Sequence, residues 1–119
     1  MKYLLLIYQS ESEMELQSEE SGNAIVAQYG KLTAGLHESG HYRAGERLQP
    51  IATATTVQVR DGKTLTTDGP FAETREQLGG FYMIEAEHLD DAIAIASKIP
   101  AARVGSIEVR PIWSVAPCQ

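Results

Sequence analysis

The sequence predicts a single α+β domain that spans residues 1–119. Short apolar runs bounded by turn residues indicate strands. Two longer stretches with apolar residues at helical spacing indicate helices. Strands and helices alternate along the chain, and no linker or internal repeat divides it, so one mixed core is expected.

The first strand is predicted over Tyr3–Tyr8, a continuous apolar run of the kind found in strands buried on both faces. The stretch from Ser10 to Ser21 is rich in Glu and Ser and interrupts this pattern. We interpret it as a solvated loop in preference to a carboxylate metal site, because such a site needs convergent ligands.

A helix is predicted from Gly22 to Ser39, where apolar residues recur at i, i+4, i+7 and i+11. These residues are Ile25, Tyr29, Leu32 and Leu36. Ser21 is expected to cap the start of the helix, and Gly40 occupies a position where a left-handed residue commonly ends one.

A short strand is expected over Tyr42–Leu48, interrupted at Gly45. Thr53–Arg60 and Lys63–Thr67 predict two more strands, joined by Asp61-Gly62. Asp-Gly between such runs is typical of a two-residue hairpin turn, in which both turn residues need positive φ.

Two further strands are predicted over Gly79–Ala86 and Gly105–Ile112. Between them, Leu89–Ile99 predicts a second helix that ends before Pro100. Acidic residues in its first turn suit the positive end of the helix dipole. The expected buried side of this helix consists of Leu89, Ala92, Ile93, Ala96 and Ile99.

This order of elements best fits a ferredoxin-like β-α-β-β-α-β sandwich with an extra hairpin. Two helices cover only one face of such a sheet, yet both faces of the predicted strands Tyr3–Tyr8 and Gly79–Ala86 are apolar. A sheet with one solvated face would alternate apolar with polar residues. We therefore expect an obligate homodimer that packs sheet on sheet.

The formal net charge of -6 argues against direct binding to nucleic acid, because the chain has no basic stripe to offset it. The apolar run Tyr3–Tyr8 is too short to cross a membrane or to act as a signal peptide. The lone cysteine, Cys118, cannot form an intrachain disulfide. A cytoplasmic protein is therefore expected.

Asp68-Gly69-Pro70-Phe71 is the most distinctive segment and follows a predicted strand. Pro70 fixes its own φ and disfavours the right-handed helical region at Gly69, so the segment is expected to form a rigid turn. The Asp68 carboxylate could then position a substrate or act as a general base. Alternatively, it hydrogen-bonds its own turn, as Asp does in Asx turns.

The chain resembles the DGPF group of the YCII-related family over almost its whole length. The motifs that carry this resemblance appear in order as MKYLLLIY, AGERLQPIATATTVQVRDGK, TTDGPFAETREQLGGFYMIEAEHLDDAIAIASKIP and SIEVRPIW. The resemblance implies a ferredoxin-like fold that dimerises into an α+β barrel. It implies no particular reaction.

In the wider family, a His on the first helix and a later Asp are proposed as an active-site pair. Tyr29 occupies the His position here, and Asp68 matches the Asp only approximately. Tyrosine is a poor base at neutral pH, because its usual pKa is about 10. Tyr29 also lies on the apolar side of its helix, so a core role with a satisfied hydroxyl is an equal alternative.

Two functions follow as expectations. A small-molecule site, enzymatic or purely binding, would lie near Asp68 in the dimer and be bordered by Gly69, Pro70, Phe71 and Tyr29. The resemblance to proteins encoded beside extracytoplasmic-function sigma factors implies instead a regulatory role through protein contacts. A third hypothesis is that the turn formed by Asp68–Phe71 is purely structural.

No cofactor or metal is expected. His37 and His41 are spaced i, i+4, but Gly40 is predicted to end the helix between them, and no cysteine or spaced carboxylate completes a ligand set. No Ser or Cys has a recognisable base partner, which argues against nucleophilic catalysis.

Overall fold

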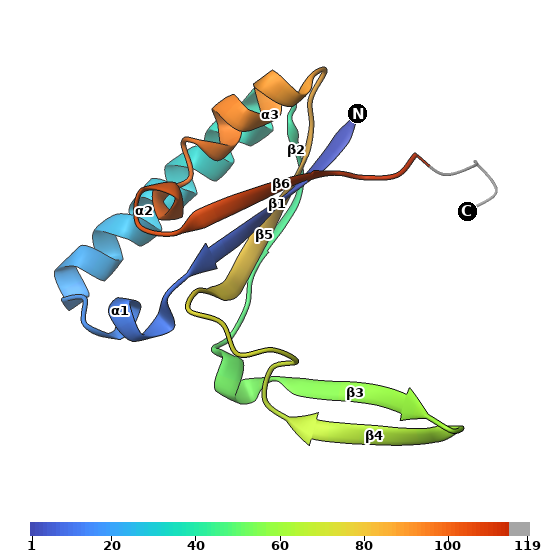
Figure 1. Ribbon diagram of the computed structural model, residues 1–119. Coiled ribbons are helices and arrows are strands. Elements are labelled where there is room, and N and C mark those ends of the chain that lie inside the picture. Colours follow the sequence, from blue (N-terminus) through green and yellow to red (C-terminus); the bar gives the residue numbers. More distant parts are fainter. Residues whose placement is uncertain (115–119) are drawn as a thin grey trace.

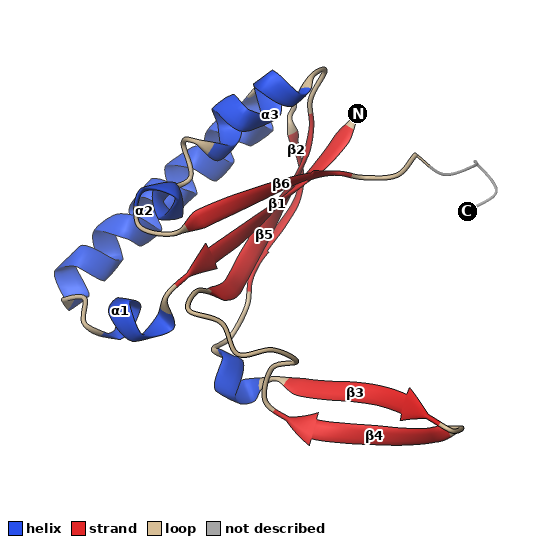
Figure 2. Cartoon of the chain, in the orientation of Figure 1, coloured by secondary structure: helices blue, strands red, loops and turns tan. Residues whose placement is uncertain are grey.

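Residues 1–114, described by a computed structural model, form a mixed α+β fold with antiparallel sheets (Figures 1 and 2). The strands are β1 Lys2–Gln9, β2 Tyr42–Arg47, β3 Thr55–Arg60, β4 Lys63–Asp68, β5 Gln77–Glu85 and β6 Ser106–Pro111. The α-helices are α1 Glu11–Glu15, α2 Glu19–Glu38 and α3 Leu89–Ala96, and Ile51–Thr53 (η1) and Pro100–Arg103 (η2) form 3₁₀ turns. The predicted α+β class is confirmed.

The main sheet has four strands in the order β2-β5-β1-β6, and α2 and α3 lie together on one of its faces (Figure 1). Alternate residues of the two central strands are buried beneath these helices. They include Leu5 and Ile84, both fully buried, and Tyr3 and Tyr82. Ile99, just beyond α3, completes the centre of the core.

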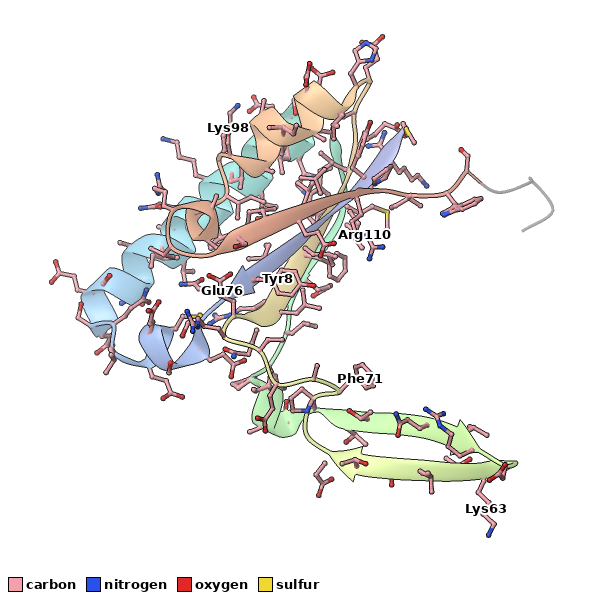
Figure 3. All side chains as sticks on the ribbon, viewed as in Figure 1. Tyr8, Lys63, Phe71, Glu76, Lys98 and Arg110 are labelled. Carbon is pink, nitrogen blue, oxygen red and sulfur yellow. The ribbon has the colours of Figure 1, made fainter. Side chains whose placement is uncertain are left out.

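The other face of the main sheet is covered by no element within residues 1–114. Leu4, Leu6 and Tyr8 of β1 alternate with the buried residues and are only half-buried, as are Phe81 and Met83 of β5. Tyr8 and Arg110 lie on this face (Figure 3). We call it the open face.

The predicted loop from Ser10 to Ser21 is wrong, because α1 and the first turn of α2 occupy it. The Ser10 hydroxyl accepts a hydrogen bond from the Glu13 backbone N–H at 3.3 Å, and the Ser18 hydroxyl accepts one from the Ser21 N–H at 3.0 Å. Two serine caps thus start two helices. Ser18, and not Ser21, caps α2, whereas the stop at Gly40 is confirmed by its φ of 81°.

The second predicted helix is shorter than expected and is rotated. It ends at Ala96, after which the Lys98 and Ile99 backbone N–H groups donate to the Ile95 and Ala96 carbonyls at 3.0 and 3.1 Å, i→i−3 bonds that tighten the last turn. Leu89 and Ile93 were expected to be buried, but they are 50% and 49% exposed. Ile95 takes their place in the core.

The remaining strands are confirmed within a few residues, and so is the Asp61-Gly62 turn, with φ values of 52° and 74°. The β3–β4 hairpin projects from the main sheet as a separate two-stranded ribbon (Figures 1 and 2). The radius of gyration is 16.5 Å, whereas about 13.5 Å is usual for this chain length. Among the described residues, no helix is long and apolar enough to span a bilayer.

Candidate functional site

A cavity of about 570 Å³ opens on the helix-covered side of the sheet, where α1 and the second half of α2 face β2 and the start of β5. This volume falls within the range of small-molecule sites. Its wall includes Tyr29, Thr33, Tyr42, Gly45, Arg47 and Tyr82. We call this space the tyrosine cavity.

Gly45 gives two tyrosine rings room at the inner end of the cavity. A Cβ at this position would lie 3.0 Å from Tyr82 Cδ1 and 3.3 Å from the Tyr42 hydroxyl. The rings of Tyr42 and Tyr82 meet edge to face, with their centroids 6.3 Å apart. His37 stacks on the outer side of Tyr42 at 4.0 Å, so the Tyr42 ring is held between two others.

Polar groups at the inner end are paired and neutral. The Tyr82 and Thr33 hydroxyls share a hydrogen bond of 2.8 Å. Burial raises the pKa of Tyr82, although the hydrogen bond from Thr33 opposes this shift. Tyr82 is therefore a neutral hydroxyl at physiological pH and can donate or accept one hydrogen bond.

Burial likewise raises the pKa of Tyr29, and this effect exceeds the opposing effects of a backbone hydrogen bond at Ala101 and the positive charge of Arg47. A general base at neutral pH would need the opposite shift. Tyr29 thus lies in the wall of the tyrosine cavity as a hydrogen-bonding residue and is not suited to the acid–base role of a histidine.

The Asp68–Phe71 segment lies outside the tyrosine cavity of its own chain, at the base of the hairpin. Gly69 has a φ of 106°; its N–H donates to the Ala54 carbonyl at 2.7 Å, and its carbonyl accepts from the Thr56 hydroxyl at 2.8 Å. Phe71 is 81% exposed and extends from the loop between β4 and β5 (Figure 3). Tyr29 is therefore not brought together with this segment within one chain.

The Asp68 side chain is exposed, and no hydrogen bond within residues 1–114 involves its carboxylate. Because this carboxylate has no partner within these residues of its own subunit, replacing Asp68 by alanine should change the free energy of unfolding of that subunit by less than about 0.5 kcal/mol. Replacing Thr56 by valine removes the bond that holds Gly69 and should cost about 1 kcal/mol. Urea denaturation of both variants checks this, and a loss above about 1.5 kcal/mol for Asp68→Ala would contradict it.

The histidines have individual structural contacts. His41 Nδ1 lies 2.7 Å from the Ser39 hydroxyl, and His37 stacks on Tyr42. His88 precedes α3, and its backbone N–H donates to the Asp91 carboxylate. In the part of the chain that the structure describes, no three His, Cys, Asp or Glu side chains are grouped to hold a metal ion. Cys118 lies outside the described residues.

Of the six wall residues named above, all but Tyr29 were not identified as site residues from the sequence. Thr33 belongs to the predicted helix, and Tyr42, Arg47 and Tyr82 belong to predicted strands. The available signal was the glycine at position 45 within a strand, because such glycines often mark a close approach of other groups.

The chain is similar to known proteins over nearly its full length. The model of the YCII-related domain matches residues 1–116. An uncharacterized protein of Rhizobium meliloti (strain 1021) is 37% identical over 114 residues, which cover 94% of this chain and 92% of that protein.

Proposed function

The chain belongs to the YCII-related domain family, and from this membership and the site geometry we propose that it is a homodimeric small-molecule-binding protein. The observation that carries the proposal is the tyrosine cavity of about 570 Å³. Its aromatic walls supply apolar contact area, and its few hydroxyl groups supply orientation. This combination is typical of ligand pockets.

Binding is favoured over acid–base catalysis at this cavity. Tyr29 and Tyr82 keep their protons at neutral pH because burial raises the pKa of both. They can orient a ligand through hydrogen bonds, but they cannot remove a proton from it efficiently.

The homodimer is proposed because the open face has no cover within its own chain. Without the β3–β4 hairpin, the main elements follow a β-α-β-β-α-β order, which supports a ferredoxin-like sandwich. Half-buried Leu6, Tyr8 and Phe81 on the open face would become buried if two such sheets packed together. The resulting assembly is the α+β barrel expected from the family resemblance.

The hairpin supports the same proposal. A two-stranded ribbon is marginally stable alone. Here Val57 and Val59 lie on one side of it and are 59% and 58% exposed. Asp68 shares that side by register, since it pairs with Thr55. We propose that this side, together with Phe71, contacts the partner subunit and brings Asp68 toward the dimer interior.

The ligand site can be tested by screening small neutral and charged fragments with NMR. Fragments that bind should shift the amide signals of Thr33, Gly45 and Tyr82. Gly45→Val should abolish these shifts, because its side chain would occupy the space where the Tyr42 and Tyr82 rings meet.

Ala44→Val is the matched control, since Ala44 pairs with Met83 and therefore faces the open side of the sheet. This variant should retain fragment binding. Fragments that still bind Gly45→Val with unchanged affinity would place the site elsewhere, and a screen without any hit would remove the proposal.

A further inference from the structure

We infer that the tyrosine cavity takes a small organic anion, of the carboxylate class, whose charged group binds the guanidinium of Arg47. This inference rests on the proposed ligand-binding function and adds the chemical class of the ligand. This assignment is supported by the position of Arg47, by the absence of an ion pair to its guanidinium within residues 1–114, and by the aromatic surface beside it.

The strand register directs Arg47 toward the cavity. Arg47 pairs with Gly80 on β5, next to the pair formed by Glu46 and Phe81. Gly80 follows the same alternation as the buried Tyr82, so Arg47 lies on the helix-covered side of β2. Gly80 has no side chain, and a Cβ there would lie 3.5 Å from Arg47 Cα. The arginine stem therefore meets no side chain across the strand pair.

The charge of Arg47 is not neutralised by the protein. Within residues 1–114, no carboxylate forms an ion pair with its guanidinium. Three glutamates also border the cavity, and each has another environment. Glu11 accepts hydrogen bonds from the Ile51 N–H at 3.1 and 3.4 Å. Glu15 and Glu46 are exposed, as Arg47 is, so solvent and salt screen all three charges.

The rest of the cavity suits the body of such a ligand. The Tyr29, Tyr42 and Tyr82 rings offer apolar and aromatic surface, while the paired Tyr82 and Thr33 hydroxyls are neutral. The positive charge of Arg47 also reaches Tyr29, where it acts to lower the pKa of the hydroxyl against the larger effect of burial. A guanidinium presents two parallel N–H donors, which match a carboxylate.

The test compares benzoate with benzamide, which has nearly the same shape but no charge. NMR titration of the full-length protein should give a dissociation constant at least about tenfold lower for benzoate, equivalent to about 1.4 kcal/mol. Arg47→Gln should remove this preference. Arg60→Gln is the control, because Arg60 lies at the end of β3 on the hairpin and should leave the preference intact.

Equal affinity for the two probes, or a preference for benzoate that survives Arg47→Gln, would overturn the inference. A lack of benzoate binding would also overturn the inference. If neutral fragments nevertheless bind at Thr33 and Gly45, only the charge inference fails and the cavity remains a ligand site. If neither neutral nor charged fragments bind, the proposed ligand-binding function fails together with the charge inference.

Discussion

Replacing Gly105 by alanine should lower the free energy of unfolding by about 3 kcal/mol, a large loss for the addition of one methyl group. Gly105 directly precedes β6, where the chain passes close to the end of β1. An added Cβ would overlap the Tyr8 carbonyl oxygen and lie 3.2 Å from Gln9 Cα. Both obstacles are backbone atoms of a central strand, so they cannot move aside as a flexible side chain can.

Gly30→Ala provides the control, because the same substitution should have the opposite sign there. Gly30 lies inside α2, its φ is not positive, and a Cβ at this position would meet nothing within 4 Å. Alanine should therefore stabilise the helix by up to about 1 kcal/mol. Urea denaturation of the two variants measures both effects. A loss below 1 kcal/mol for Gly105→Ala would show that β1 and β6 separate easily.

The elements that could be predicted from the sequence are those in which a local pattern and the tertiary structure agree. The apolar positions of α2 at helical spacing include Leu36, which is buried, and Tyr29 and Leu32, which pack against the core. The position of the β3–β4 hairpin turn could be predicted from Asp61-Gly62, because few residue pairs tolerate two consecutive positive φ values. By contrast, α1 has only five residues and owes its start to a serine cap, a signal that also occurs in loops.

The cavity wall could not be predicted because a strand irregularity changes which residues share a face. Strict alternation along β2 would group Tyr42 with Ala44 and Glu46. Instead, Tyr42 pairs with Ile84 and Ala44 with Met83, so Arg43 is an extra residue in β2. This bulge places Tyr42 on the same side as Gly45 and Arg47. No local pattern in the sequence marks its position.

The two faces of the main sheet differ, because α2 and α3 cover one face and no described element covers the other. Leu6→Lys on the open face should convert a homodimer into a monomer. Leu6 pairs with Phe81 on one side and with Glu108 on the other. Glu108 can compensate a lysine within the single chain, so the fold should persist. Two ammonium groups brought into a sheet-on-sheet interface would, however, cost about 3 kcal/mol or more, equivalent to more than a hundredfold in the dissociation constant.

Sedimentation equilibrium at micromolar concentration measures the result directly. The unmodified protein should have twice the 13.0 kDa mass of the chain, and Leu6→Lys should have that mass once. Ile93→Lys is the control, because Ile93 is 49% exposed on α3, on the other side of the sheet, and should leave the dimer intact. A monomeric unmodified protein would refute the dimer. A dimeric Leu6→Lys variant would instead show that the copies associate through another surface, and the hairpin side with Val57 and Val59 would then be the next surface to alter.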